Sequence, residues 1–218
     1  FHVTGVQTCA LPICAAVGLG YSKDALVLLA TAQWLRNLGY QAVPSLNDTA
    51  LAIPLAIQAG LGEYGRHGLV ITPEFGPRVR FGKIFTDAPL DHDAPVEFGV
   101  SAFCEVCRRC TDACPPKAIP DGEPSPVKLN RSAIGGVRKW SVDGEKCFSY
   151  WTQIVTDCMI CMRVCPYNKD FSRWRHRVGR RLAATRLRRL MLRLNDRLGY
   201  GERLRPREWW AGATRRRT

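Results

Sequence analysis

CEVCRRCTDACP (residues 104–115) and CFSYWTQIVTDCMICMRVCP (residues 147–166) are the two stretches of this 218-residue chain that decide its fold. The first has the cysteine spacing C-x2-C-x2-C-x3-C-Pro, and the second has C-x10-C-x2-C-x3-C-Pro. Three closely spaced thiolates of this kind wrap one 4Fe–4S cluster, while the fourth cysteine of each run binds the other cluster. The doubled pattern therefore predicts two 4Fe–4S clusters and the transfer of single electrons.

Crossed ligation of this kind uses eight of the ten cysteines. Cluster one is expected to take Cys104, Cys107, Cys110 and Cys165. Cluster two is expected to take Cys114, Cys147, Cys158 and Cys161. Zinc sites use separated C-x2-C pairs, and disulfide frameworks suit small secreted domains without a core, so both alternatives are weaker interpretations of the same cysteines.

Upstream of the cysteines, short helices and strands are expected to alternate. A helix is predicted over 20–39, with Ser22 as its N-cap and Gly39 as the residue that ends it. The alternation predicts an α/β layer, and residues 88–99 form a linker to the cysteine-rich module, which starts at Ser101. The other expected elements are a strand at 40–43 stopped by Pro44, a helix at 49–59 with Asn47-Asp48 as turn and N-cap and a kink at Pro54, a glycine-rich loop at 60–68, strands at 69–72 and 79–86, and a loop-rich insertion at 119–146.

The first residues of the chain contain a stretch that does not look like native protein. GVQTCALPI (residues 5–13) looks like translated sequencing adaptor, so residues 1–13, with Cys9, are predicted to be an artefact. Cys14 lies at the join and receives no role, and the native protein is expected to continue upstream. The sequence has no run of 18 or more apolar residues, so no membrane-spanning helix is expected.

The charge excess of the chain lies in its last part. Residues 171–218 contain sixteen Arg and three acidic residues, which accounts for the whole net charge of +13. Apolar residues near helical spacing predict one basic amphipathic helix over 171–198, which suits an anionic membrane surface. Packing on its own domain with a solvated basic face is an equally open alternative. Nucleic-acid binding is not expected, because Trp209 and Trp210 are too few for a stacking platform.

GYQAVPSLNDTALAIPLAIQAGLGEYGRHGLVITPEFGPRVRFGKIFTDAPL (residues 39–90) resembles the cobalamin-binding domain of the reductive dehalogenases. Both cysteine segments and NDRLGYGERLRPREWW (residues 195–210) resemble the same family, over about 15–210 in all. The resemblance implies an α+β protein in three parts. These are the C-terminal part of a nitroreductase-like α/β cobalamin-binding domain at 14–99, a ferredoxin-like two-cluster 4Fe–4S domain at 100–170, and the basic tail at 171–218.

The resemblance also implies a reaction, in which cobalamin, reduced to Co(I) through the clusters, removes halogen from an organohalide and a proton replaces it. Tyr21 aligns with the family's proton donor, and Asn47 and Arg80 align with the partners that stabilise its deprotonated form. A phenol titrates near pH 10 unaided, so a neighbouring permanent cation makes it a usable acid. Arg78 is the nearby alternative to Arg80, and His67 is expected to be structural or solvent-facing.

Partners and location follow from the resemblance as well. Family members that respire organohalides carry a twin-arginine export signal, so a peripheral site on the outer face of the cell membrane is expected, with the cytoplasm as the alternative. Expected partners are an electron donor protein or a quinol-linked chain, and a membrane anchor protein. Two other functions stay open: an epoxyqueuosine reductase acting on transfer RNA, which lacks the Cys-Pro-Tyr-Asn-Lys ending found here at 165–169, and a plain ferredoxin-type electron carrier.

Overall fold

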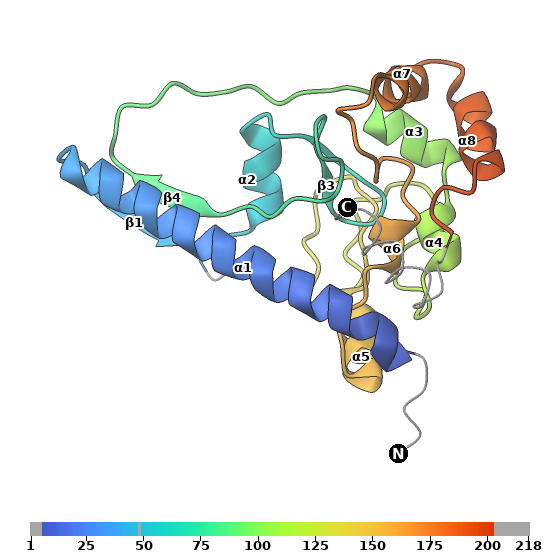
Figure 1. Cartoon of the computed structure of the whole chain (residues 1–218), viewed down its shortest axis with the longest axis horizontal. Helices are drawn as coiled ribbons and strands as arrows, with labels where there is room; N and C mark the ends of the chain where they lie inside the picture. The colour runs from blue at the N-terminus through green and yellow to red at the C-terminus, as the bar shows by residue number, and fades with distance from the viewer. Residues whose placement is uncertain (1–5, 48, 203–218) are drawn as a thin grey trace, which may run out of the picture.

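A computed structural model describes residues 6–47 and 49–202, with side chains from Ala15 onward. These residues form an α+β fold of helices and two small sheets (Figure 1). A long helix and one sheet extend to one side of the molecule. The cysteine-rich helices gather at the other side. Cys9, Cys14, Asp48, Trp209 and Trp210, on which some sequence expectations rest, lie outside the described residues or side chains.

The first helix, α1 (Val6–Asn37), is much longer than expected at its N-terminal end. Ser22 lies inside it and is not an N-cap, because its hydroxyl donates to the Gly18 carbonyl at 2.9 Å, one helical turn back. The end of the helix agrees with the sequence. Gly39 has a φ of +94° and its N–H donates to the Arg36 carbonyl at 3.0 Å, so this glycine stops the helix.

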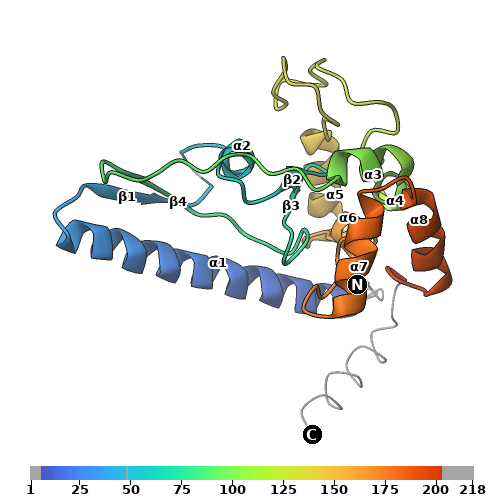
Figure 2. The same ribbon diagram turned by 90° about the horizontal axis from the view of Figure 1, so that it is seen from above.

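The first sheet pairs β1 (Ala42–Ser45) with β4 (Lys83–Thr86) in antiparallel register and packs on the C-terminal half of α1 (Figure 2). The interface is a small core of Ala32, Leu35 and Ala42. Pro44 was expected to stop this strand but lies within it. Within the described residues this strand pairs on one side only, so it tolerates a residue without an N–H.

The second sheet also has only two strands, β2 (Glu63–Tyr64) and β3 (Val70–Ile71), paired antiparallel. β2 lies in the stretch expected to be a glycine-rich loop, and the two separate sheets replace the expected α/β layer. The preceding helix, α2 (Ala52–Gln58), is shorter than expected and starts after Leu51, without a side-chain cap. Pro54 falls in its first turn, where the missing N–H has no intrahelical partner to lose, so it does not need to kink the helix.

The cysteine-rich part consists of α3 (Val100–Val106), α4 (Arg109–Ala113), α5 (Gly144–Ile154) and α6 (Ile160–Arg163). Residues 87–99 contain no helix or strand, as expected of a linker. The insertion before α5 is loop-rich, also as expected, with one isolated bridge between Ser125 and Lys139. The main hydrophobic core combines Ile71 from β3 with Phe103 and Tyr167 from the cysteine-rich part, so the two parts share one interior.

The basic tail forms two helices, α7 (Trp174–Ala183) and α8 (Arg188–Arg197), rather than the single helix that was predicted. Thr185 separates them, because its hydroxyl donates to the Leu182 carbonyl at 2.8 Å and accepts the Leu187 N–H at 3.2 Å. Phe171, Ala183 and Met191 are buried in the main core. α8 contacts both α3 and α7, and both tail helices lie near α3 in Figure 1, so this side of the tail packs on its own domain.

One stretch of α1, Ala15–Asn37, is long and apolar enough to cross a membrane by length and composition, with a mean hydropathy of 1.2. This corrects the expectation that the chain has no segment of that kind. The two criteria alone are weak evidence for a span, since signal sequences and core helices satisfy them too. Only 11% of the stretch is buried, so most of its side chains face away from the described core.

Candidate functional site

Four cysteines from two distant segments line one enclosed cavity: Cys104, Cys107, Cys110 and Cys165. The first belongs to α3, the second ends α3, the third belongs to α4, and the fourth follows α6. Burial raises the pKa of the Cys104 and Cys110 thiols to about 12, and that of Cys165 also rises well above its usual value. Thiolates this far from water need a bound cation, and iron supplies that charge in a cluster.

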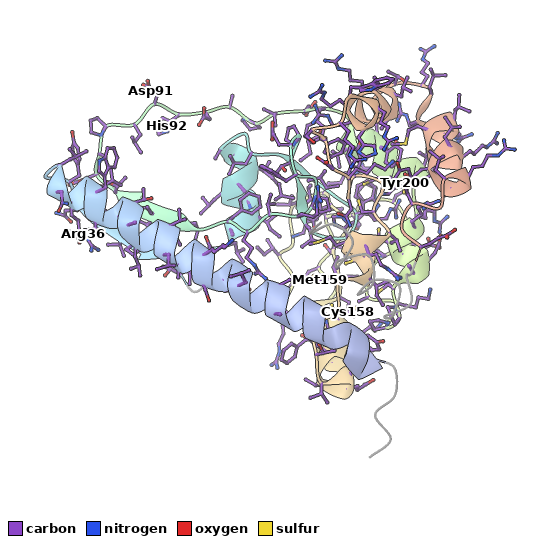
Figure 3. The ribbon with its side chains drawn as sticks, in the orientation of Figure 1. Arg36, Asp91, His92, Cys158, Met159 and Tyr200 are labelled. Atoms are coloured by element: carbon purple, nitrogen blue, oxygen red, sulfur yellow. The ribbon has the colours of Figure 1, made fainter. Side chains whose placement is uncertain are left out.

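The other four cysteines form a second group, in which Cys114 is buried and Cys147, Cys158 and Cys161 are partly buried. Cys114 ends α4, Cys147 is on α5 and Cys161 is on α6. Burial, followed by repulsion from the Cys110 thiolate of the first group and then from Cys158, raises the pKa of Cys161 to about 12. Cys158 lies just ahead of α6 (Figure 3). The structure thus places the first four cysteines around one cavity and brings Cys147 and Cys158 near Cys114, while the assignment of four ligands to each cluster stays a prediction.

Arg66, which the sequence did not single out, braces the first cavity. Its side chain is 2% exposed, and its Nε donates to the Cys104 carbonyl at 3.0 Å. Its Nη1 donates to the Pro120 and Gly122 carbonyls at 3.1 and 3.0 Å, and the guanidinium lies 4.6 Å from the Trp140 ring centroid. A permanent positive charge therefore lies beside the cysteines and ties the inserted loop to α3.

His67 and Tyr167 also line this cavity. His67 is buried, which corrects the alternative that it faces solvent. Sequence alone gave one signal for this position, the glycine-rich run GEYGRHG at 62–68, because glycines permit close approach of a loop to another element. Tyr167, two residues after the last cysteine, had no such signal. Asp91 and His92, by contrast, lie on the extended linker away from the cysteines (Figure 3).

The three predicted catalytic residues come together at the middle of α1. Asn47 donates from Nδ2 to the Tyr21 hydroxyl oxygen at 3.2 Å. The guanidinium of Arg80 lies over the Tyr21 ring, 3.7 Å from its centroid. The alternative residue, Arg78, reaches elsewhere and donates to the Lys169 carbonyl. The structure therefore favours Arg80 over Arg78 as the cation beside Tyr21.

This contact group combines a phenol, a hydrogen-bond donor and a cation, which are the groups expected around a proton donor. The phenol oxygen accepts the Asn47 N–H, so its own O–H is available to a substrate. Arg80 places a permanent cation beside the ring, and Asn47 places an N–H donor at its oxygen. Gly20 provides room for the pair, since a Cβ there would lie 2.7 Å from Arg80 Nε.

The cysteine-rich part matches a known iron–sulfur class. Residues 103–168 match the family described as a 4Fe-4S double cluster binding domain. Residues 6–90 match the family described as a reductive dehalogenase subunit. Together with the relatives described next, these matches show that the chain belongs to the reductive dehalogenase family.

A tetrachloroethene reductive dehalogenase of Desulfitobacterium hafniense is 45% identical over 170 residues, which cover 76% of this chain and 31% of the relative. The solved catabolic reductive dehalogenase NpRdhA aligns with a TM-score of 0.69 and 32% identity, over 79% of this chain and 25% of that one. An epoxyqueuosine reductase of Lactococcus garvieae is 30% identical over 142 residues, covering 57% of this chain and 34% of the relative. The chain spans 31% and 40% of the first two curated relatives.

Proposed function

We propose that the whole protein is a reductive dehalogenase that removes halogen from an organohalide, using electrons that pass through two 4Fe–4S clusters. The observation that carries the proposal is the contact group of Tyr21, Asn47 and Arg80 on a chain that also has a double-cluster domain. Each turnover would consume two electrons and one proton and release one halide ion. The identity to a tetrachloroethene reductive dehalogenase, 45%, exceeds the 30% identity to an epoxyqueuosine reductase, which favours a halogenated substrate.

The proposed ligands of cluster one are the four cysteines of the first cavity, and those of cluster two are the four of the second group. The donor set fits, because each group offers four thiols, and buried thiols are held largely un-ionised until iron binds. The crossed pattern draws the fourth ligand of each cluster from the other cysteine run. It thereby brings the two clusters close enough for electrons to pass between them.

Residues 14–99 are proposed to be the C-terminal part of a nitroreductase-like domain that binds cobalamin. α1 and the residue after it expose large apolar side chains that are 55–68% exposed: Leu19, Leu26, Val27, Leu29, Trp34 and Leu38. Full burial of one such side chain contributes about 1.5–3 kcal/mol, so further layers of the same domain would gain much by packing here. Cobalamin, when bound, would supply the reducing centre that takes the halogen.

Within this domain, Tyr21 is proposed to give the proton that replaces the halogen. Tyr21 is 39% exposed, which leaves room for a substrate beside its ring. Asn47 would hold the phenol oxygen by its N–H, and Arg80 would hold the ring and stabilise the tyrosinate until a proton returns from solvent. Neither partner needs to move or titrate for this role.

The test is an assay of the full-length protein, purified without oxygen and supplied with cobalamin and a low-potential one-electron reductant. Halide release from a panel of chlorinated and brominated ethenes and phenols, with corrinoid bound, is the expected result. Bound clusters without corrinoid or halide release would instead favour the electron carrier. Reduction of epoxyqueuosine in a tRNA stem loop, with no halide release, would favour the second enzyme.

We also propose that the protein works at the outer face of the cell membrane after twin-arginine export, in organohalide respiration, with a donor protein or quinol-linked chain and a membrane anchor as partners. The tail supports attachment even though one side of it packs on its own domain. Away from that side it exposes apolar residues between its arginines: Trp174, Val178, Leu187, Leu190, Leu194 and Leu198. Such a surface suits anionic lipid.

Deleting the whole tail would also remove Phe171, Ala183 and Met191 from the core, so point changes are the better test of attachment. Replacing Arg189 and Arg193 by Gln should weaken sedimentation with anionic vesicles, most clearly at low salt. The matched control replaces two exposed arginines of the inserted loop, Arg131 and Arg138. Equal binding of both double variants and the unmodified protein would refute membrane attachment through α8.

A further inference from the structure

Two buried hydrogen-bond donors line the first cysteine cavity without a hydrogen-bond partner among the described residues. They are Nε2 of His67 and the hydroxyl of Tyr167, in side chains that are 6% and 1% exposed. A buried polar group left without a partner costs about 1–3 kcal/mol, and such groups are few in native proteins. Two of them on the wall of one cavity indicate an acceptor inside it.

The loop of His67 fixes both the orientation and the tautomer of its ring. The Leu69 N–H donates to Nδ1 at 3.2 Å, and burial lowers the pKa of the ring to about 4, so the ring is neutral. A neutral imidazole that accepts at Nδ1 has its proton on Nε2. Gly65 allows the ring to lie this close, since a Cβ there would be 2.9 Å from His67 Cε1. Nε2 is therefore an N–H donor.

Tyr167 is held with equal firmness by aromatic neighbours. Phe98 and Phe103 contact its ring edge-on, with centroids 6.3 and 5.4 Å away. A phenol titrates near pH 10, so the hydroxyl has a proton to donate at neutral pH. Phenylalanine would fill the same apolar surroundings without leaving a polar group unpaired. The hydroxyl is best explained by an acceptor that it serves.

We propose that His67 Nε2 and the Tyr167 hydroxyl donate hydrogen bonds to sulfur atoms of cluster one and thereby raise its reduction potential. The proposal rests on the proposed ligation by Cys104, Cys107, Cys110 and Cys165. Reduction adds one electron to the cluster and no proton, so the sulfur atoms become more negative. Hydrogen bonds to those sulfurs stabilise the reduced form more than the oxidised form. The two side chains are positioning and tuning residues and have no contact with substrate.

The experiment uses three single variants of the full-length protein, purified without oxygen. Tyr167→Phe removes only the hydroxyl. His67→Asn keeps an acceptor near the position of Nδ1 but has no group near Nε2, while His67→Gln restores an N–H donor near Nε2. The potential of each cluster is measured by electron paramagnetic resonance during titration with a low-potential reductant. A second reading is the exchangeable-proton coupling to the reduced cluster, compared in H2O and D2O.

Tyr167→Phe and His67→Asn should each lower the ratio of reduced to oxidised cluster one about tenfold at a fixed potential, which is a shift of about 59 mV for one electron. His67→Gln should recover most of the loss, and the potential of cluster two should stay unchanged. The proton coupling should weaken in the first two variants. Iron and sulfide content near eight of each, with unchanged potentials and couplings in both variants, would overturn the proposal.

Failure of the proposed function gives a different result from failure of this inference. An unmodified protein that binds no 4Fe–4S cluster would refute the ligation itself. If His67→Asn lost its clusters, Tyr167→Phe would still decide, because its ring packing on Phe98 and Phe103 is retained. A changed potential with normal iron content has no explanation in a purely structural role for the hydroxyl.

Discussion

Replacing Tyr21 by Phe is the sharpest perturbation of the proposed chemistry, because it keeps the ring under Arg80 and removes only the hydroxyl. Turnover in halide release should fall by roughly 10²–10⁴, the usual contribution of general acid catalysis. Cobalamin and iron content should stay at the level of the unmodified protein. Tyr40→Phe is the matched control, since Tyr40 is in the same part of the chain. Its hydrogen bond to the Leu35 carbonyl comes from the backbone N–H, which the substitution keeps.

The size of the Arg80 effect follows from the geometry. With its guanidinium 3.7 Å from the ring centroid, the charge of Arg80 is about 4–5 Å from the phenol oxygen, and two unit charges at that distance interact by about 4 kcal/mol at an effective dielectric constant of 20. Tyr21 is 39% exposed, so solvent screening reduces this to about 1–2 kcal/mol. Arg80→Met should therefore slow turnover by roughly 5–30-fold.

The double variant separates a shared step from two independent effects. If Arg80 acts on the Tyr21 oxygen, Arg80→Met should cost far less in the Tyr21→Phe protein than in the unmodified one. Arg78→Met, which removes the same charge two residues away, should leave turnover within about twofold, since its guanidinium reaches Lys169 instead. Dehalogenation that continues at most of its rate in Tyr21→Phe, with both cofactors bound, would show that the proton comes from another group.

Three further changes test the frame of the first cavity in the full-length protein. Cys165→Ala should damage cluster one and spare cluster two, seen by electron paramagnetic resonance; loss of cluster two instead would refute crossed ligation. Gly76→Ala should lower the thermal unfolding temperature much more than Gly39→Ala. Both glycines have a positive φ, which costs about 1–2 kcal/mol for alanine, but of the two only Gly76 has a position where a Cβ would collide with the Tyr167 carbonyl. Equal losses in the two variants would contradict this close approach. Arg66→Met should destabilise by about 3 kcal/mol or more, because several buried carbonyls lose a charged donor, and a shift of the unfolding temperature below 2 °C would contradict it.

Local sequence patterns predicted the features that depend on few residues. The cysteine spacing is such a feature, and the structure places the four cysteines predicted for cluster one around one cavity, while the ligand set of cluster two stays a prediction. The end of α1 at Gly39 is another, because only glycine adopts its backbone conformation without strain. The resemblance to a family over about residues 15–210 supplied Tyr21, Asn47 and Arg80, which no spacing rule would have selected.

Features that depend on tertiary packing were missed or misplaced. Ser22 is a good N-cap residue, but a helix interior also satisfies its hydroxyl, so its type alone does not fix a boundary. Thr185 breaks the tail by the same kind of side-chain bond. Arg66 and His67 look like a solvated pair in a loop until the fold places the inserted loop and the cysteines around them.

The interior around Arg66 and Glu63 shows why the two segments that match different families form one folded unit. Glu63 of β2 accepts the Val100 N–H at 3.2 Å at the start of α3, and Arg66 binds the carbonyl of the first cluster cysteine. Residues of the dehalogenase segment therefore form one wall of the cluster cavity. Electron transfer depends steeply on distance, and a wall shared in this way holds the distance between cluster and catalytic domain fixed. The linker at 87–99 does not weaken that coupling, because the contacts run through the core and not through the linker.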